Sequence, residues 1–405
     1  MYIRRALEKT ISEINETFPV LLISGPRQVG KTTLLKQLAG ADRKYVTLDD
    51  PLLRELAITE PELFLQRFSP PVIIDEIQYA PQLLPYIKMY VDSNKDNGSF
   101  WLTGSQMFHL MKNVSESLAG RVGIVNLLGL SGNEISGVSS DPFVVEPKML
   151  MSKVNGAEPL ELPAVFTRIF TGSMPALYSI KNISRELFYS SYVQTYLQRD
   201  VKDLTQVGDE LTFLRFLTAV AAHTGQALNY SELAKDIGVS APTAKQWLSI
   251  LVSSGIVALI EPYYNNTLKR LIKSPKMYFL DTGLCAYLTK WTTAEALESG
   301  AMSGAFFETW VVSEIIKSYY NAGRRPPLYY YRDKDQHEID LIIHEDNTLY
   351  PIEIKKSGNP GRAAIKNFAV LATTGQNIGA GCVICLVKDL LPIDRNNWLI
   401  PAWLV

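Results

Sequence analysis

The sequence predicts an α/β protein of several domains, the first of which holds a parallel, doubly wound sheet. Three observations predict this class. The length of 405 residues allows two to four domains, each able to bury its own core. Over roughly the first 130 residues, short apolar segments of strand length alternate with helical segments, the order that builds a parallel sheet. A second α/β pattern begins near residue 300, after a stretch of helical periodicity.

The first domain is expected to open with a helix over residues 3–17 and then to place five strands in its sheet. These strands are Val20–Ile23, Tyr45–Leu48, Val72–Asp75, Phe100–Thr103 and Ile124–Leu128. Ligand-binding residues of such a sheet belong at the carboxyl ends of its strands.

The segment that follows the first strand reads Gly-Pro-Arg-Gln-Val-Gly-Lys-Thr, a full match to the phosphate-loop pattern G-x-x-x-x-G-K-[ST] between a strand and a helix. Gly25 and Gly30 let successive N–H groups point at the phosphates, and the following helix adds its positive dipole end. Lys31 is expected to reach the β- and γ-phosphates, and the Thr32 hydroxyl to bind Mg²⁺. The predicted ATP-binding residues are Gly25, Pro26, Arg27, Gln28, Val29, Gly30, Lys31, Thr32 and Thr33.

Two carboxylates end the third predicted strand. Asp75 fits the residue that holds Mg²⁺, and Glu76 fits the base that orients or deprotonates the attacking water. The fourth strand ends in small polar groups, and Thr103 or Ser105 is expected either to bond the γ-phosphate or water, or to do no more than form a turn.

Arg121 stands just before the fifth predicted strand. An arginine suits the stabilisation of charge on the transferring phosphoryl group. Three roles stay open: a contact with its own nucleotide, a contact with the nucleotide of a neighbouring subunit in a homo-oligomer, or pairing with an acid. Asp49 is expected to cap a helix, or else to contact Mg²⁺ indirectly or to contact a substrate.

The middle of the chain has the pattern of a winged helix-turn-helix. Helices are expected over Leu211–His223, Tyr230–Ile237 and Ser240–Ser253, with strands over Ile256–Glu261 and Lys276–Leu280. Asn229 or Ser231 and Ser240 are the expected helix caps.

Double-stranded DNA is the partner that this unit suggests. The predicted wing carries basic residues without an acid, and these are Lys269, Arg270, Lys273 and Lys276. They would hold phosphates, while Lys245 and Gln246 face a groove. A winged helix used only for packing or protein docking is the alternative.

Near the C-terminus, Glu338-Ile339-Asp340 precedes one predicted strand and Glu353-Ile354-Lys355 ends the next. This arrangement resembles the core of PD-(D/E)xK nucleases. The resemblance implies that Asp340 and Glu353, with Glu308 from the preceding helix, hold a second divalent ion (Mg²⁺ or Mn²⁺), and that Lys355 positions the attacking water. A solvated sheet edge with paired charges is the alternative. Tyr329–Tyr331 and Arg332 would stack on bases or, for the tyrosines, fill the core.

Composition limits the partners and the cellular compartment that we expect for this protein. The net charge of −1 gives no global attraction to nucleic acid. No apolar run approaches the ~20 residues of a membrane span, and the N-terminal segment lacks the features of a secretory signal. The three cysteines are expected to be buried thiols in a reducing cytoplasm, although Cys382 and Cys385 match C-x-x-C.

Taken together, the motifs resemble the prokaryotic AAA-type ATPases that carry a C-terminal domain of unknown function. The phosphate loop, Leu48-Asp49-Asp50-Pro51, Asp75-Glu76-Ile77-Gln78, Leu102-Thr103-Gly104-Ser105, Ala119-Gly120-Arg121 and Tyr196-Leu197-Gln198-Arg199-Asp200 carry this resemblance. The chain is also similar to archaeal ATPases that join such a core to a winged helix and a nuclease-like domain.

The resulting prediction is an AAA-type core over residues 1–138, a helical lid over 139–208, a winged helix over 209–290 and a nuclease-like domain over 300–405. Its function is expected to be Mg²⁺-dependent ATP hydrolysis that controls DNA engagement. The alternative is a nucleotide-driven switch whose rear domains bind proteins and cut nothing.

Overall fold

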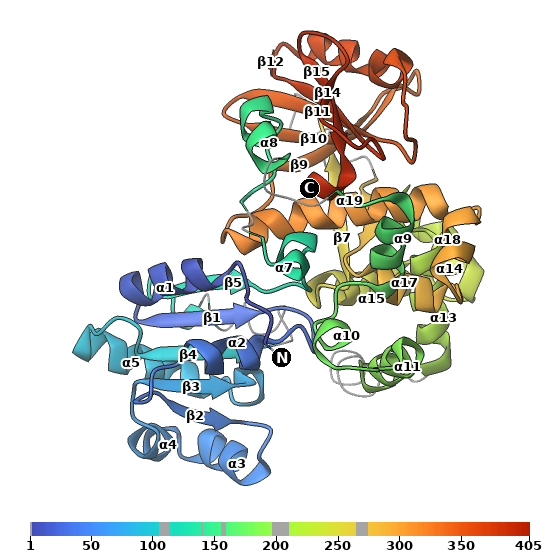
Figure 1. Ribbon diagram of the computed structural model, residues 1–405. Coiled ribbons are helices and arrows are strands. Elements are labelled where there is room, and N and C mark those ends of the chain that lie inside the picture. Colours follow the sequence, from blue (N-terminus) through green and yellow to red (C-terminus); the bar gives the residue numbers. More distant parts are fainter. Residues whose placement is uncertain are drawn as a thin grey trace.

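The computed structural model describes residues 2–104, 114, 116–138, 141–154, 159–196, 210–264 and 274–405. The first domain lies at one end of the molecule and the C-terminal sheet at the other, with the helices of the middle of the chain beside both (Figure 1).

The predicted parallel sheet of the first domain is confirmed. Its five described strands are hydrogen-bonded in the order β2-β3-β4-β1-β5, and every pair is parallel. They span β1 Val20–Ser24, β2 Lys44–Thr47, β3 Val72–Asp75, β4 Phe100–Gly104 and β5 Val122–Asn126. The fifth strand begins two residues earlier than Ile124, because Val122 and Gly123 continue the pairing with β1.

Helices cover both faces of this sheet, which explains why the three central strands β1, β3 and β4 are buried at every residue. On β1, Leu21 and Ile23 face one hydrophobic cluster while Val20 and Leu22 face another. The helical elements are α1 Glu8–Thr17, α2 Lys31–Leu38, α3 Pro51–Thr59, α4 Pro61–Arg67, η1 Ile77–Tyr79 and α5 Leu83–Asn94.

The middle of the chain is mainly helical. It contains α7 Gly132–Ser136, α8 Pro147–Val154, α9 Leu162–Thr171, α10 Ala176–Ser179, α11 Arg185–Tyr196, α13 Glu210–Ala222, α14 Tyr230–Ile237 and α15 Ala241–Ser253. Asn229 caps α14 and Ser240 caps α15, while Gly238 ends α14 with a left-handed φ of 74°. Two strands follow at β7 Val257–Pro262 and β8 Lys276–Phe279, and a short strand that sequence patterns missed, β6 Gln226–Ala227, pairs with β8.

The C-terminal part packs a sheet against one long helix, α19 (Figure 1). Its helical elements are α17 Thr282–Leu288, α18 Ala294–Ser299, α19 Ser303–Asn321, η3 Arg362–Thr374 and η4 Ala402–Leu404. The strands are β9 Leu328–Arg332, β10 Glu338–Glu345, β11 Thr348–Ile354, β12 Asn377–Ile378, β13 Gly381–Cys385, β14 Leu391–Pro392 and β15 Asn397–Pro401. The segment η3 has 3₁₀ geometry, and within it only Phe368 and Leu371 are buried.

One sheet runs through both the middle and the C-terminal parts. Strand β7 pairs in parallel with β9, through Glu261 with Tyr329 and Pro262 with Tyr330. The described strands then follow the order β14-β15-β13-β11-β10-β9-β7-β8-β6, with β12 attached to β11. The predicted boundary between residues 290 and 300 divides these parts along the chain, but the sheet continues across it.

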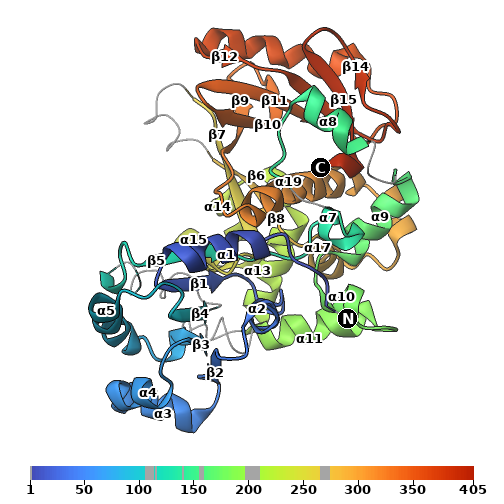
Figure 2. The same ribbon diagram turned by 60° about the vertical axis from the view of Figure 1, so that its left-hand side comes forward.

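Helix α19 joins the first domain to this second sheet. It lies between them in both views (Figure 1, Figure 2). Glu314 Oε2 accepts a hydrogen bond of 2.6 Å from Gly132 N, and Lys317 Nζ donates to Leu130 O at 3.1 Å and to Glu314 Oε1 at 2.8 Å. Because these groups are buried, the hydrogen bonds fix the segment that follows β5, around Leu130–Gly132, against α19.

No described helix is long and apolar enough to cross a membrane.

Candidate functional site

The phosphate loop has the backbone curvature that its glycines permit. Gly25, Gln28 and Gly30 have φ values of 144°, 61° and 93°. A Cβ atom on Gly25 would lie 2.0 Å from the carbonyl oxygen of Leu127, so no side chain fits at this position. The loop is therefore shaped by glycine at two points before α2 begins.

Lys31 is buried inside this loop. Its Nζ atom donates hydrogen bonds to the carbonyl oxygens of Gly25 at 2.9 Å and Pro26 at 2.8 Å. Its positive charge is therefore held at the N-terminus of α2, where the helix dipole also favours an anion.

Asp75 is the centre of a hydroxyl cluster at the carboxyl end of β3. The Thr32 hydroxyl lies 3.0 Å from both carboxylate oxygens, and the Tyr45 hydroxyl donates to Oδ2 at 2.9 Å. The Thr103 hydroxyl donates to Oδ1. Burial and the bond to Asp75 raise the pKa of Tyr45. An adjacent hydroxyl and carboxylate are oxygen ligands of the kind that Mg²⁺ prefers, so Thr32 and Asp75 fit this ion.

Glu76 follows β3 in a left-handed conformation, with a φ of 59°. Its N–H donates to the Thr103 hydroxyl at 3.1 Å, and Gln78 Nε2 donates to its Oε2 atom. A non-glycine residue in this region is strained, and such strain concentrates at functional sites. Thr103 is fully buried, and its hydroxyl group positions both Asp75 and Glu76. Ser105 lies outside the described residues.

The other loop residues have different surroundings. Gln28 and Thr33 are exposed, whereas Val29 is buried. The Val29 carbonyl accepts a 2.9 Å hydrogen bond from Arg5 Nη1. Pro26 packs against Gly255 of the middle part, where an added Cβ would lie 2.9 Å from Pro26 Cγ. Neither contact has a local sequence signal.

Arg121 lies at the amino ends of the parallel strands, whereas the phosphate loop lies at their carboxyl ends. The Arg121 carbonyl bonds Val20 N at the start of β1, whereas the loop follows the end of that strand. Its Nη2 atom lies 3.1 Å from Asp92 Oδ2. This placement corrects the alternative in which Arg121 contacts its own nucleotide, and it shows the pairing with an acid. The expectation that Asp49 caps a helix is also wrong, because the side chain of Asp50 caps α3.

A second candidate site brings together the four residues predicted near the C-terminus. Glu308 comes from α19, Asp340 from β10, and Glu353 and Lys355 from the end of β11. Lys355 Nζ lies 2.5 Å from Glu353 Oε1 and 3.6 Å from Asp340 Oδ2. Asp340 Oδ2 also accepts a 2.8 Å bond from Ile354 N, which fixes the carboxylate against β11.

Two further residues that the sequence did not assign to this site complete it. Lys276 Nζ lies 2.6 Å from Glu338 Oε1, 3.3 Å from Glu308 Oε1 and 3.8 Å from Asp340 Oδ1. The alternation Glu338-Ile339-Asp340 could have indicated that both acids share one face of β10. Lys276 carried no such signal.

This position corrects the expectation that Lys276 holds DNA phosphates, because only 5% of the residue is exposed. The other predicted wing residues, Lys269, Arg270 and Lys273, lie outside the described residues.

Burial and repulsion between carboxylates raise the pKa of Glu353 and that of Glu308. Burial, and then the charge of Asp340, raise the pKa of Glu353 to about 7, although Lys355 opposes the shift. Burial raises the pKa of Glu308. Burial alone lowers the pKa of Lys276, but the three carboxylates together raise it. Glu353 Oε2 is a buried oxygen without a hydrogen-bond partner among the described residues.

Comparison with known proteins agrees with the geometry at the phosphate loop. Residues 17–136 match a family model described as an AAA domain, 163–295 a domain of unknown function (DUF8612), and 303–405 a domain of unknown function (DUF4143). An uncharacterized protein of Mycobacterium bovis, Mb2031c, is 30% identical over 88% of this chain and 73% of its own length. The M. tuberculosis protein Rv2008c matches equally. The chain belongs to this family of AAA-type ATPases with a C-terminal DUF4143 domain.

Solved structures give a weaker likeness. The Walker-type ATPase PABY2304 of Pyrococcus abyssi has a TM-score of 0.43 and 16% identity, covering 71% of this chain and 96% of its own. AMPPCP-bound DnaA of Aquifex aeolicus has a TM-score of 0.30 and 12% identity, covering 61% and 85%. At these values neither structure says what the AAA-type ATPase described here binds.

The tyrosines of the DUF4143 domain that were expected to stack on bases or to fill the core mostly serve packing. Tyr330 is buried and donates to Ser274 O at 2.6 Å. Tyr329 meets the buried Tyr263 edge to face at 5.8 Å between ring centroids. Arg332 is exposed and bonds Gln336 through its guanidinium group.

The C-x-x-C pair of this domain cannot form one metal site. Both cysteines are buried on β13, and burial raises the pKa of Cys382 and raises that of Cys385 to about 11. Cys382 packs into one hydrophobic cluster and Cys385 into another, because residues three apart on a strand face opposite sides.

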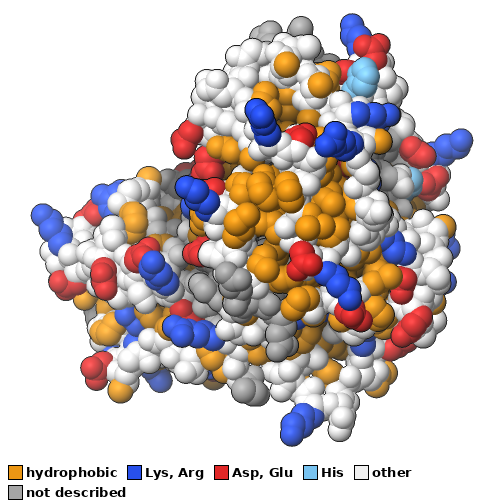
Figure 3. Space-filling model, turned by 45° about the horizontal axis from the view of Figure 1, so that its top comes forward, with side chains coloured by type: hydrophobic (Ala, Val, Ile, Leu, Met, Phe, Trp, Pro, Cys, Tyr) orange, Lys and Arg blue, Asp and Glu red, His pale blue; other side chains and the backbone are white. Residues whose placement is uncertain are grey.

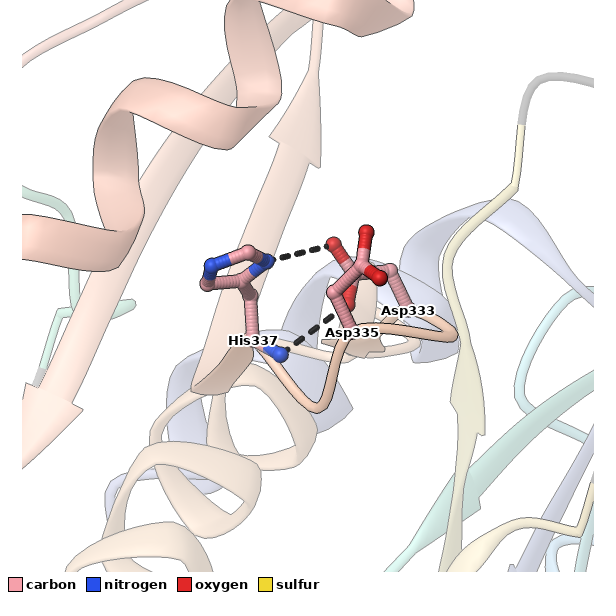
Figure 4. A group of neighbouring side chains, drawn as sticks. All are labelled: Asp333, Asp335 and His337. Atoms are coloured by element: carbon pink, nitrogen blue, oxygen red, sulfur yellow. Dashed lines mark hydrogen bonds and ion pairs between the residues drawn. The ribbon is translucent and has the colours of Figure 1, made fainter.

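Asp333, Asp335 and His337 lie together on the turn between β9 and β10 (Figure 4). His337 donates its N–H to Asp333 Oδ1, and its Nδ1 lies 2.9 Å from Asp333 Oδ2. Because Asp335 and His337 are exposed and these bonds close the turn, turn formation accounts for the group.

Proposed function

We propose that this protein hydrolyses ATP with Mg²⁺ and that its nucleotide state controls DNA engagement by a winged helix and a nuclease-like domain. The observation that carries the proposal is the convergence of Lys31, Thr32 and Asp75 at one edge of the first sheet. Thr32 and Asp75 would hold Mg²⁺, which neutralises phosphate charge, and Lys31 would bind the phosphates.

Glu76 is proposed as the residue that orients the attacking water. Its support is its place directly after Asp75, with its carboxylate oriented by Gln78. Arg121 is proposed to serve a neighbouring subunit, since its own nucleotide is at the carboxyl ends of the strands. That role requires a homo-oligomer in which the Asp92 pair opens.

The contact of Pro26 with Gly255 supports coupling between the nucleotide and the middle part. A cavity of about 350 Å³ adjoins this contact, lined on one side by Gly25 and Asn126 and on the other by Val252 and Tyr320. A shift of the phosphate loop on ATP binding would therefore displace the turn between α15 and β7.

The middle part is proposed to be a winged helix that contacts duplex DNA. The order α13-β6-α14-α15-β7-β8 supports this reading, and Lys245 and Gln246 on α15 are exposed. On the face seen in Figure 3, basic and acidic side chains are interspersed, so that face offers no basic stripe to DNA.

The C-terminal domain is proposed to be nuclease-like. Its residues fit a divalent ion, because the unpartnered Glu353 Oε2 and the Asp340 carboxylate are buried oxygen ligands beside each other. A bound ion would activate water and stabilise charge at a phosphodiester. Lys355 would position that water, and Glu308 would add a third carboxylate.

Filter binding of duplex and single-stranded DNA, with and without ATP and Mg²⁺, tests DNA engagement. The proposal expects duplex affinity that changes with the nucleotide. Loss of Mn²⁺-dependent nicking in D340A, E353A and K355A tests cleavage, and unchanged nicking in all three would refute the nuclease assignment.

One observation favours the alternative of a nucleotide-driven switch that binds proteins. Lys276, a basic residue of the expected wing, is buried among carboxylates and is not available to phosphates. Absence of DNA affinity in every nucleotide state, together with intact ATP hydrolysis, would support this alternative.

A further inference from the structure

Lys276 is supplied to the C-terminal acid cluster by a strand of the middle part. It is the first residue of β8, which pairs with β7 on one side and with β6 on the other. Ile260 of β7 is its partner in the ladder, and β7 in turn continues into β9. The amino group thus reaches the acids from outside the domain that contains them.

The amino group lies between three carboxylates from two elements. Glu308 belongs to α19, while Glu338 and Asp340 belong to β10, and their nearest oxygens are 2.6–3.8 Å from Lys276 Nζ. The Tyr278 hydroxyl also donates to Glu308 Oε1 at 2.7 Å, which fixes that carboxylate toward the lysine. The exposed Arg332 lies farther out, with its Nε atom 3.8 Å from Glu338 Oε2.

Asp340 is shared between two ammonium groups. Lys276 approaches its Oδ1 atom and Lys355 its Oδ2 atom. Glu353, 7% exposed, holds Lys355 through Oε1 and leaves Oε2 without a described partner. The cluster therefore has a free buried carboxylate oxygen on the Lys355 side, while Lys276 fills the space on the other side.

A divalent ion bound by these oxygens would compete with Lys276. Mg²⁺ requires oxygens at about 2.0–2.1 Å, which would draw Asp340 and Glu308 inward to where the ammonium group now lies. Two cations a few ångströms apart in a buried site repel strongly.

We propose that the Lys276 ammonium and a divalent cation bound by Glu308, Asp340 and Glu353 exclude one another. β8 then acts as a latch, and the nuclease-like site takes up metal only when β8 withdraws the lysine. The link to DNA rests on the proposed function, because a duplex held by the winged helix would act on the strand that carries Lys276.

Manganese binding by the full chain tests the latch without any measurement of cleavage. Isothermal titration with MnCl₂ is carried out on wild type, K276Q and K276R, and thermal melting is followed in EDTA and in Mn²⁺. K276Q is expected to bind Mn²⁺ about tenfold tighter or better than wild type, because one buried positive charge is removed. Its melting temperature, lowered in EDTA, should rise with Mn²⁺, whereas wild type and K276R should change little.

The double variant K276Q/D340N is the matched control, because it retains the phosphate-loop metal site and should lose the gained affinity. Equal Mn²⁺ affinity in wild type and K276Q, or no added binding in K276Q, would overturn the proposal. Melting curves of K276R show whether the position tolerates change. Failure of DNA cleavage would bear on the proposed function and leave this result intact.

Discussion

At the scale of single residues, Glu76 follows directly after the acid that contacts Thr32. Glu76→Gln keeps the shape and the left-handed backbone but removes the negative charge that would orient water. We expect ATP binding within about twofold of wild type and a fall in turnover of about 10²-fold or more.

Phosphate release and ATP titration measure the two effects separately. Lys31→Ala should instead lose binding. Wild-type turnover in Glu76→Gln would remove this residue from the role.

Arg5 is a buried charge on which the phosphate loop depends. It pairs with Glu134 at 2.9 Å and donates to the carbonyls of Val29 and Leu128. Arg5→Ala leaves Glu134 buried without its cation, and breaking such a pair typically costs about 3–5 kcal/mol of unfolding free energy. Arg4→Ala, at a side chain that is 89% exposed, should change stability by less than about 0.5 kcal/mol.

Chemical denaturation of both variants provides the measurement. Equal effects at the two positions would contradict the buried role of Arg5.

Glu353 makes stability depend on pH. Its ordinary pKa of 4.5 rises to about 7 in the folded protein through burial and the charge of Asp340. Between these values the folded state holds a proton that the unfolded chain has released, so the unfolding free energy falls as pH rises.

Denaturation in EDTA at about pH 5 and about pH 8 should show this loss in wild type, and Glu353→Gln should reduce it. The same loss in the variant would assign the dependence to another group.

At the scale of elements, local sequence patterns predicted the strands of the first sheet well. They did not predict the contacts between segments that are far apart in the chain. The central strands β1, β3 and β4 are short, largely apolar runs that are buried throughout, and Asn229 and Ser240 mark the starts of α14 and α15. The contacts of Arg5 and Lys276 join segments far apart in the chain, so no local periodicity encodes them. The pairing of β7 with β9 escaped prediction for the same reason.

The turn between α15 and β7 offers a matched pair of glycines for a test. Gly255 and Gly238 have φ values of 71° and 74°, and only Gly255 would place a Cβ against Pro26. Both alanine variants should lose about 1–2 kcal/mol because of the left-handed backbone. Only Gly255→Ala is expected to weaken ATP binding as well, because it presses on the phosphate loop.

Denaturation and ATP titration of the two variants separate these effects. Equal ATP affinity in Gly255→Ala and wild type would contradict coupling through this contact.

At the scale of the whole molecule, the phosphate loop, α19 and the second sheet form one connected path. The loop meets Gly255, α19 holds the segment that follows β5, and β7 continues into the strands beside the acid cluster. Nucleotide binding at one end can therefore bias the placement of β8 at the other, provided that ATP binds as the loop geometry indicates.

Calorimetric titration of the full chain with ATP and Mg²⁺ tests that claim most directly, with Lys31→Ala as the paired variant. We predict saturable heat for wild type that falls when Mg²⁺ is removed, and none for the variant. If folded wild-type protein gives no binding heat, or if the variant binds ATP as tightly as wild type, ATP binding at the phosphate loop is contradicted.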